Sequence, residues 1–395
     1  MSSDGAGRIL MVDDTEINLR VLAGILDKAG YESVSTMDGD DAIAMAHSYH
    51  PDLILLDIMM PGRDGFDVCA ELKADPRTME IPIIFLSGRA DSADKVRGLQ
   101  AGAVDYMTKP FDRAEVLARV EVHISLRRMT SALIQANDDL VDRQRLLDED
   151  LRAAAEVQRA LIYKGRPGLP GLTTAGRFVP CSTVGGDLYN GVQLSDTSSA
   201  LWMLDVSGHG VPSALVSMCA GQSLTPMGGF VLTPERQPAR PSDVMNALDA
   251  EYPFERFEKF FTAAYVVIDA ATGALTHTSA GHPPPLLVRA NGTVLALEEG
   301  GALVGSGIGR YEQGEQRLVA GDRVLLYTDG VTEHESPEHL RFGDGRLIEV
   351  LVQKRRGTLD AVCNGVMEAL AEFGKGLPFA DDVSLFAFEY TGDPR

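Results

Sequence analysis

Acidic residues gather at the ends of apolar runs in two separate parts of this 395-residue chain. The first group is Asp13, Asp14 and Asp57, accompanied by Ser87 and Lys109. Three carboxylates at one point repel one another, so a divalent cation such as Mg²⁺ is expected to hold them. Beside that cation, Asp57 is a candidate acceptor of a phosphoryl group, whose oxygens Lys109 and Ser87 could bind. A single Asp would more often be a helix cap, but five such residues at strand ends are hard to explain that way.

The second acidic group has no nucleophile beside it. No Ser–His–Asp or Cys–His arrangement is evident, so the pattern favours metal and water over covalent catalysis. All-oxygen ligands suit Mg²⁺ or Mn²⁺ better than zinc, and two such ions could activate water against a phosphate ester. His209 lies in the nearby turn VSGHG, but the oxygen-rich set argues against a histidine ligand. The acids of this group are Asp187, Asp205, Asp329, Asp381 and Asp382.

Short apolar runs alternate with helical patterns over the first 124 residues. This alternation predicts an α/β fold with an open, doubly wound, five-stranded parallel sheet. Ligands bind at the carboxyl ends of the strands in such sheets, which is where the first group of residues falls. The expected strands are Ile9–Val12, Val34–Thr36, Leu53–Leu56, Ile83–Leu86 and Val104–Met107, and the expected helices are Ile17–Ala29, Ala42–Ser48 and Val96–Ala101.

The segments MVDD, LILLDIMMPGRDGF, FLSG and DYMTKPF, in this order and spacing, resemble a response-regulator receiver domain. The resemblance covers about residues 7–124, and we assign 1–124 to this domain. It implies that a sensor histidine kinase phosphorylates Asp57. It also implies a Mg²⁺ site formed by Asp14, Asp57 and the Met59 carbonyl with Asp13 in support, and a switch pair formed by Ser87 and Tyr106, with Lys109 on the phosphoryl group.

The segment from Phe111 to Lys164 contains neither glycine nor proline, which predicts a long helix. We take Arg113–Ser125 as the last receiver helix and 125–164 as a helical linker. One heptad position reads Leu126, Leu133, Leu140, Leu147, Ala154 and Leu161. The second seam is largely polar, so we expect a marginal parallel coiled coil in a homodimer. The alternative is a single surface helix packed on the second domain.

Strand-like runs dominate residues 165–395, after the helix-breaking sequence GRPGLPG. Several strands followed by a helix, repeated, predict an α+β domain with a two-sheet sandwich flanked by helices. The expected strands are Thr173–Val179, Ala200–Val206, Thr262–Ile268, Ala274–Ser279, Pro285–Val288, Arg323–Thr328 and Val383–Phe388. The expected helices are Pro212–Leu224, Ser242–Ala250, Gly345–Gln353 and Leu359–Phe373.

The segments VGGD, DVSGHG, FFTAAYVVID, SAGHPPP, LYTDGVTE and DDVSLF resemble the metal-dependent PPM (PP2C-type) phosphatases, in the bacterial branch that includes SpoIIE and RsbU. The resemblance implies hydrolysis of a phosphoserine or phosphothreonine protein, usually a STAS-type anti-sigma-factor antagonist. EVQRALI, at the end of the linker, resembles the regulatory helix of that branch. The implied ligands of two Mn²⁺ or Mg²⁺ ions are Asp187, bridging Asp205, the Val206 carbonyl, Asp329 and one of Asp381 and Asp382.

One position departs from that family pattern. Asn190 stands where the first motif usually has a second Asp. An amide can contact a metal but adds no charge, which keeps open a degenerate domain that sequesters a partner when the receiver is phosphorylated. The leading hypothesis is a receiver-controlled phosphatase.

Composition limits the class of partner. The 57 acidic and 36 basic residues give a net charge of −21, which argues against nucleic acid or an anionic membrane as the main partner, and so against a DNA-binding regulator. The four cysteines form no CxxC pair. No run of 18 apolar residues and no leader-like N-terminus is evident, so we expect a cytoplasmic protein.

Overall fold

The chain forms two compact units, Met1–Gln144 and Arg145–Arg395. The computed structural model describes residues 7–88, 92–164, 168–208 and 210–392. The boundary between the units falls inside one long helix, α5 (Arg113–Leu161). Among the described residues, no helix is both long enough and apolar enough to cross a membrane.

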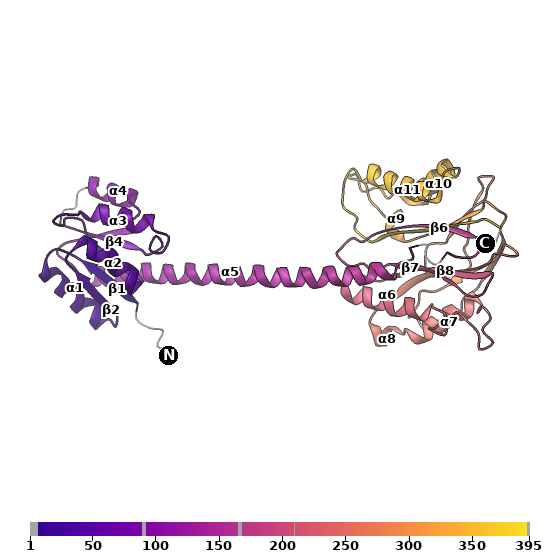
Figure 1. Ribbon diagram of the computed structural model, residues 1–395, viewed down its shortest axis with the longest axis horizontal. Coiled ribbons are helices and arrows are strands. Elements are labelled where there is room, and N and C mark those ends of the chain that lie inside the picture. Colours follow the sequence, from indigo (N-terminus) through magenta and orange to yellow (C-terminus); the bar gives the residue numbers. More distant parts are fainter. Residues whose placement is uncertain (1–6, 89–91, 165–167, 209, 393–395) are drawn as a thin grey trace. The chain divides into compact units, whose positions relative to one another are not determined.

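The N-terminal unit is a parallel sheet covered by helices on both faces (Figure 1). Its strand order is β2-β1-β3-β4-β5, and every pairing is parallel, which confirms the predicted doubly wound sheet. The sequence interpretation missed helix α3. The strands are β1 (Arg8–Val12), β2 (Glu32–Thr36), β3 (Leu53–Asp57), β4 (Ile83–Ser87) and β5 (Asp105–Thr108). The helices are α1 (Glu16–Lys28), α2 (Gly39–Tyr49), α3 (Gly65–Ala74) and α4 (Ser92–Gln100), followed by the start of α5.

Strands β3 and β4 are buried along their whole length, because each face of the sheet has its own hydrophobic core. On one face, Leu22 of α1 and Val120 of α5 pack in one cluster. On the other face, Ala46 of α2 and Leu72 of α3 pack in a second cluster. Both faces are therefore sealed, and polar groups can meet only at the rim where the strands end.

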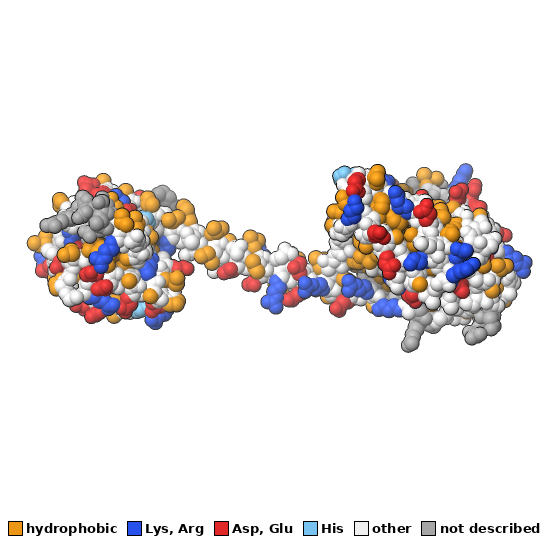
Figure 2. Space-filling view, turned by 90° about the horizontal axis from the view of Figure 1, so that it is seen from above, with side chains coloured by type: hydrophobic (Ala, Val, Ile, Leu, Met, Phe, Trp, Pro, Cys, Tyr) orange, Lys and Arg blue, Asp and Glu red, His pale blue; other side chains and the backbone are white. Residues whose placement is uncertain are grey.

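Helix α5 is continuous over 49 residues, as the absence of glycine and proline predicted. Large apolar side chains are exposed along its middle part (Figure 2). Its last turns pack instead on the C-terminal unit, where Ala155 and Gln158 are buried. The exposed apolar residues include Leu126, Met129, Leu133, Leu140, Val141 and Leu147.

The C-terminal unit contains two sheets packed face to face, as predicted. One sheet has the order β12-β11-β15-β16-β6; the other has the order β13-β10-β9-β8-β7, with β14 added beside β10. The first sheet consists of β6 (Leu172–Val179), β11 (Leu286–Val288), β12 (Val294–Ala296), β15 (Arg323–Tyr327) and β16 (Val383–Tyr390). The second consists of β7 (Leu188–Gln193), β8 (Ser198–Val206), β9 (Phe261–Asp269), β10 (Ala274–Ala280), β13 (Gly300–Gly301) and β14 (Gly314–Arg317).

The main core fills the space between these sheets, where the rings of Tyr189 and Phe386 stack with centres 4.9 Å apart, and it continues on the outer side of the second sheet, where Trp202 faces Gly221 of α6. Helices α10 and α11 cover the outer face of the first sheet, and α6 and α7 cover the second (Figure 1). The sequence interpretation missed β7 and the short elements β12, β13, β14, α8 and α9. The helices are α6 (Val211–Ser223), α7 (Pro241–Glu251), α8 (Phe254–Phe257), α9 (Asp329–Thr332), α10 (Gly343–Lys354) and α11 (Leu359–Gly374).

Candidate phosphoacceptor site and metal centre

Three strand ends of the N-terminal unit place a lysine between two aspartates. Asp13 follows β1, Asp57 ends β3, and Lys109 follows β5. The Lys109 Nζ lies 2.8 Å from Asp13 Oδ2 and 2.8 Å from Asp57 Oδ2. Both carboxylates are buried, at 0% and 3% exposure. Because the surrounding core leaves them no other direction, these groups share one small polar site.

Asp14 completes an acidic group at this rim. One carboxylate oxygen from each of Asp13, Asp14 and Asp57 lies within 4.8 Å of the others. Asp13 is held by the Thr15 backbone N–H and the Asn18 Nδ2, which both donate to its Oδ1 at 2.9 Å. These oxygen donors are of the type that Mg²⁺ takes, so the group fits such an ion.

Opposing effects act on the pKa of Asp57. Burial raises its pKa above the usual value, the Lys109 ammonium lowers it, and Asp13 raises it again. The Met59 backbone N–H also hydrogen-bonds to it, which places the Met59 peptide beside the site. The net effect is a raised pKa, which a divalent ion beside the carboxylates would reduce.

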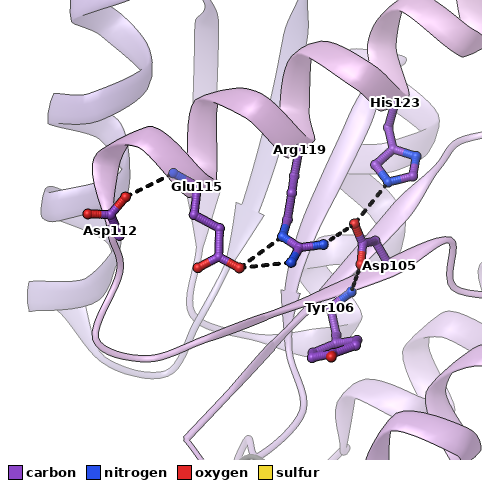
Figure 3. Close-up of polar contacts among 6 residues, drawn as sticks. All are labelled: Asp105, Tyr106, Asp112, Glu115, Arg119 and His123. Atoms are coloured by element: carbon purple, nitrogen blue, oxygen red, sulfur yellow. Dashed lines mark hydrogen bonds and ion pairs between the residues drawn. The ribbon is translucent and has the colours of Figure 1, made fainter.

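The two predicted switch residues lie on adjacent strands. Ser87 ends β4 and is buried, and Tyr106 lies in β5. Figure 3 shows that Asp105, next to Tyr106, joins β5 to α5: its Oδ2 accepts from Arg119 at 2.6 Å and lies 3.2 Å from His123 Nε2. The Arg119 guanidinium also lies 5.9 Å from the centre of the Tyr106 ring. The strand that carries the switch tyrosine is thus tied directly to the first turns of α5.

A second acidic site is built where β8, α9 and β16 meet the start of β7 in the C-terminal unit. Asp187 precedes β7 and is 1% exposed; its Oδ2 accepts from Thr328 Oγ1 at 2.8 Å and from Ser384 Oγ at 2.6 Å. The Asp382 Oδ2 accepts from the Gly186 backbone N–H at 2.6 Å. These bonds join segments that lie 141 to 197 residues apart in the sequence.

Two glycines before Asp187 allow the close packing of this site. A Cβ on Gly185 would lie 2.4 Å from Asp382 Oδ2, and a Cβ on Gly186 would lie 2.6 Å from the Val206 carbonyl oxygen. Neither position has room for a side chain. The predicted ligands Asp382 and Val206 are therefore held against the loop that presents Asp187.

The acids of the second site destabilise one another's charges. Burial, followed by Asp205 and Asp382, raises the pKa of Asp187 well above its usual value. Burial and repulsion from Asp329 and other neighbours raise the pKa of Asp205 to about 7, and burial and Asp381 raise that of Asp329. No Lys or Arg within the described part of the chain pairs with Asp187, Asp205 or Asp329. Clustered carboxylates without a basic partner fit bound divalent cations.

The last turn of α5 contacts the loop of this site directly. The Gln158 side chain is 1% exposed; its Nε2 donates to the Gly185 carbonyl at 2.8 Å and to the Asp187 carbonyl at 3.3 Å. Its Oε1 accepts from the Gly185 N–H at 3.2 Å. The sequence analysis included Gln158 only as part of the segment EVQRALI and missed this role.

Asn190 has other partners than the acids. Its Nδ2 donates to the Leu161 carbonyl, at the end of α5, at 3.0 Å, and its Oδ1 accepts from the Gly191 N–H at 2.7 Å. The polar atoms of the side chain are therefore engaged with helix α5 and β7. A carboxylate could not make the bond to Leu161, which gives this departure from the family pattern a local structural reason.

Several residues near the acids were not anticipated. Thr328 and Ser384 hold Asp187 in place. The sequence signal for them was their position next to acids of the site: Thr328 directly precedes Asp329, and Ser384 follows the segment DDV. Cys181 was given no role, but it lies beside Asp381 and Asp382. His209 lies outside the described residues.

Two family profiles match the chain. "Response regulator receiver domain" matches residues 9–121, and "Stage II sporulation protein E (SpoIIE)" matches residues 195–391. The chain carries a receiver domain followed by a SpoIIE-type domain. The SpoIIE-type domain is similar in fold to the SiaA-PP2C domain of Pseudomonas aeruginosa, with a TM-score of 0.55 and 23% identity, over 63% of this chain and 98% of that one.

The curated relatives match only part of this chain. The response regulator PleD of Caulobacter vibrioides is 38% identical over 178 residues, which is 41% of this chain and 39% of PleD. The chain thus spans about two fifths of the length of these relatives. The comparisons thus show a receiver domain followed by a SpoIIE-type domain with a PP2C fold.

Proposed function

We propose that this protein is a metal-dependent phosphoprotein phosphatase controlled by phosphorylation of Asp57. The observation that carries the proposal is the convergence of Asp187, Asp205 and Asp329, with raised pKa values and no basic partner among the described residues. Such a site requires cations, and it lies in a domain with the PP2C fold. A receiver site with its own acceptor, Asp57, precedes α5 in the sequence.

The residues of the SpoIIE-type domain would have two roles, to hold the metal ions and to position the ligands. Asp205 and the Val206 carbonyl would hold two Mn²⁺ or Mg²⁺ ions together with Asp187, Asp329 and one or both of Asp381 and Asp382. When bound, the ions would supply Lewis-acid activation of water and of the phosphate ester. Thr328 and Ser384 keep Asp187 aimed through their hydrogen bonds, and no side chain acts as a nucleophile.

The receiver domain would supply the control. Asp14, Asp57 and the Met59 carbonyl, with Asp13 in support, would hold Mg²⁺ while a sensor histidine kinase donates the phosphoryl group. Lys109 would then move its ion pair from the carboxylate of Asp57 to the phosphoryl oxygens. Ser87 and Tyr106 would respond, and the contacts of Asp105 with Arg119 and His123 would pass the change to α5.

The partners follow from this scheme. The substrate would be a protein carrying phosphoserine or phosphothreonine, for which a STAS-type anti-sigma-factor antagonist in a partner-switching pathway is our first candidate. The exposed apolar residues of α5, from Leu126 to Leu147, support a homodimer through this helix. Asn190 was the sequence argument for an inactive domain that sequesters a partner. Its side chain is hydrogen-bonded to the Leu161 carbonyl and the Gly191 N–H.

Hydrolysis of a phosphorylated STAS-type protein by the full chain with Mn²⁺ tests the proposal. We expect metal-dependent release of phosphate that Asp205→Asn reduces by at least about 100-fold, as loss of charge stabilisation at a reacting centre commonly does. Equal rates for Asp205→Asn and the unmodified chain would contradict the site. Absence of turnover with Mn²⁺ and Mg²⁺, with and without a phosphoryl donor, would refute the activity.

A further inference from the structure

Strand β6 has a free edge in the C-terminal unit. It stands last in the order β12-β11-β15-β16-β6, so within its sheet it pairs with β16 alone. Directly before β6, the Gly171 carbonyl accepts from the Thr391 N–H at 2.9 Å, so in this antiparallel register the odd-numbered residues of β6 bond to β16. The backbone N–H and C=O groups of the even-numbered residues Thr174, Gly176 and Phe178 therefore face the free edge.

Most of these edge groups have no partner. The Gly176 carbonyl accepts from Arg177 Nη1 at 2.7 Å, and within the described part of the chain no other hydrogen bond reaches the outward backbone groups of the three residues. The neighbouring edge strand, β7, is protected instead: the Tyr163 N–H donates to the Tyr189 carbonyl at 3.4 Å. The segment after α5 thus covers one edge and leaves the other open.

A cavity of about 490 Å³ lies between the open edge and the end of α5, and residues 174–178 line it. The Tyr189 side chain also lines it and is 3% exposed, yet its hydroxyl has no hydrogen-bond partner among the described residues. A Cβ on Gly176 would lie 2.5 Å from this hydroxyl, so the glycine keeps room for it beside the strand. A buried polar group without a partner is costly, and a ligand that bonds to it removes that cost.

The rim of this cavity is basic. Arg159, in the last turn of α5, and Lys164 both line the cavity and are exposed, and neither forms an ion pair with a described residue. Arg177 lines it too, but its charge is balanced by Asp360 at 3.0 Å. Two uncompensated positive charges stand out on a chain whose net charge is −21. They favour a negatively charged ligand.

We propose that the free edge of β6 binds an extended, acidic segment of a protein partner as an added strand. The backbone of such a segment supplies the alternating donors and acceptors that the edge lacks. Its acidic side chains would meet Arg159 and Lys164, and one of its oxygens would accept from the Tyr189 hydroxyl. A compact anion could satisfy the charges but not the row of backbone groups.

The bound segment would touch the end of α5 as well as β6. Arg159 follows Gln158, whose side chain holds the loop that presents Asp187. Contacts made only while the helix end is docked shift the equilibrium toward the docked state. An effect of the segment on phosphatase activity would rest on the proposed function, whereas pairing at the edge does not.

Two synthetic peptides with blocked ends test the edge on the full-length chain. Each is long enough to span β6; one alternates threonine with glutamate, the other threonine with lysine. We expect only the acidic peptide to bind, as followed by fluorescence anisotropy. Residue-resolved hydrogen exchange should then slow at least about fivefold at the amides of Thr174, Gly176 and Phe178, which gain acceptors. The amides of Ala175 and Arg177, which already bond to β16, should change little.

Three substitutions locate the contacts. Arg159→Glu should weaken binding of the acidic peptide at least about fivefold, as reversal of a surface charge pair does. Arg152→Glu is the matched control, because Arg152 is an exposed residue of the same helix that does not line the cavity, and it should leave the affinity unchanged. Tyr189→Phe keeps the ring and should weaken binding about fivefold through loss of the hydroxyl.

A chemical variant of the peptide makes the test independent of protein folding. Methylation of alternate backbone nitrogens prevents pairing as a strand and leaves the charges in place, so the methylated acidic peptide should not bind. Equal binding of the methylated and unmethylated peptides would indicate a site for anions in general and would overturn the proposal. Equal affinities of Arg159→Glu and Arg152→Glu, or no binding of the acidic peptide up to about 1 mM, would overturn it too. Binding that protects the three edge amides in a chain without turnover would separate this inference from the proposed function.

Discussion

Replacement of Gln158 by alanine would separate the end of α5 from the loop that presents Asp187. The substitution removes three hydrogen bonds, to the Gly185 carbonyl, the Asp187 carbonyl and the Gly185 N–H, from a side chain that is 1% exposed. At about 1 kcal/mol for each bond, docking of the helix end should lose about 3 kcal/mol. That free energy corresponds to about a 100-fold change in the docking equilibrium.

Hydrogen exchange and calorimetry measure the two consequences of Gln158→Ala. The backbone amides of residues 155–162 should exchange up to about 100-fold faster, because the docked state protects them. Mn²⁺ affinity should fall by about tenfold, since Gln158 supports the peptide of a proposed ligand, Asp187. Gln135→Ala is the matched control: Gln135 is exposed on the same helix, and its one bond, to Asp139 at 3.2 Å, contributes a few tenths of a kcal/mol. If Gln158→Ala, like the control, leaves amide exchange and Mn²⁺ affinity unchanged, Gln158 does not couple the helix to the site.

Three further predictions concern pH, the end of α5 and the receiver. Because burial and neighbouring carboxylates raise the pKa of Asp205 to about 7, Mn²⁺ must displace a proton below that pH. Calorimetry should show Mn²⁺ affinity rising toward pH 7 and then levelling; pH-independent affinity would contradict this. Tm of the metal-free protein should fall as pH rises from the ordinary carboxyl pKa of 3.8 to about 7 and then level, because over this range the unfolded chain has lost the proton that the fold keeps. Asn190→Asp should speed amide exchange in the last turn of α5, because it removes the donor to Leu161 and adds a negative charge at the helix C-terminus, at a cost of about 1 kcal/mol. Arg119→Ala should lower receiver stability toward urea by about 1 kcal/mol through loss of the 2.6 Å contact with Asp105, and an unchanged midpoint would count against that link.

The architecture of the receiver could be predicted almost completely, because local patterns determine it. Apolar runs that end in Asp13, Asp57 and Ser87 identify the strands, and parallel strands bring their carboxyl ends to one rim. Helix α3 was missed although Asp64 caps it by accepting from the Asp67 N–H. Its short sequence follows a proline–glycine turn, and no helix was assigned to it.

The finer contacts of the second site could not be predicted, because they join residues distant in sequence. Gln158 reaches Gly185 across 27 positions, and Cys181 reaches Asp382 across 201. The heptad pattern continues through Gln158, so periodicity alone cannot distinguish a seam between two helices from a face packed on the chain's own domain. Only the fold shows that from about Leu151 onward this face packs on the chain's own C-terminal unit.

The central claim, that phosphorylation of Asp57 controls a phosphatase, is tested most directly by one comparison of rates. Mn²⁺-dependent hydrolysis of a phosphoserine protein would be measured with and without a small-molecule phosphoryl donor, for the unmodified chain and for Asp57→Ala. We predict that the donor changes the rate of the unmodified chain and leaves that of Asp57→Ala unchanged. A metal-dependent rate that responds to the donor equally in both proteins, or in neither, would contradict control through Asp57.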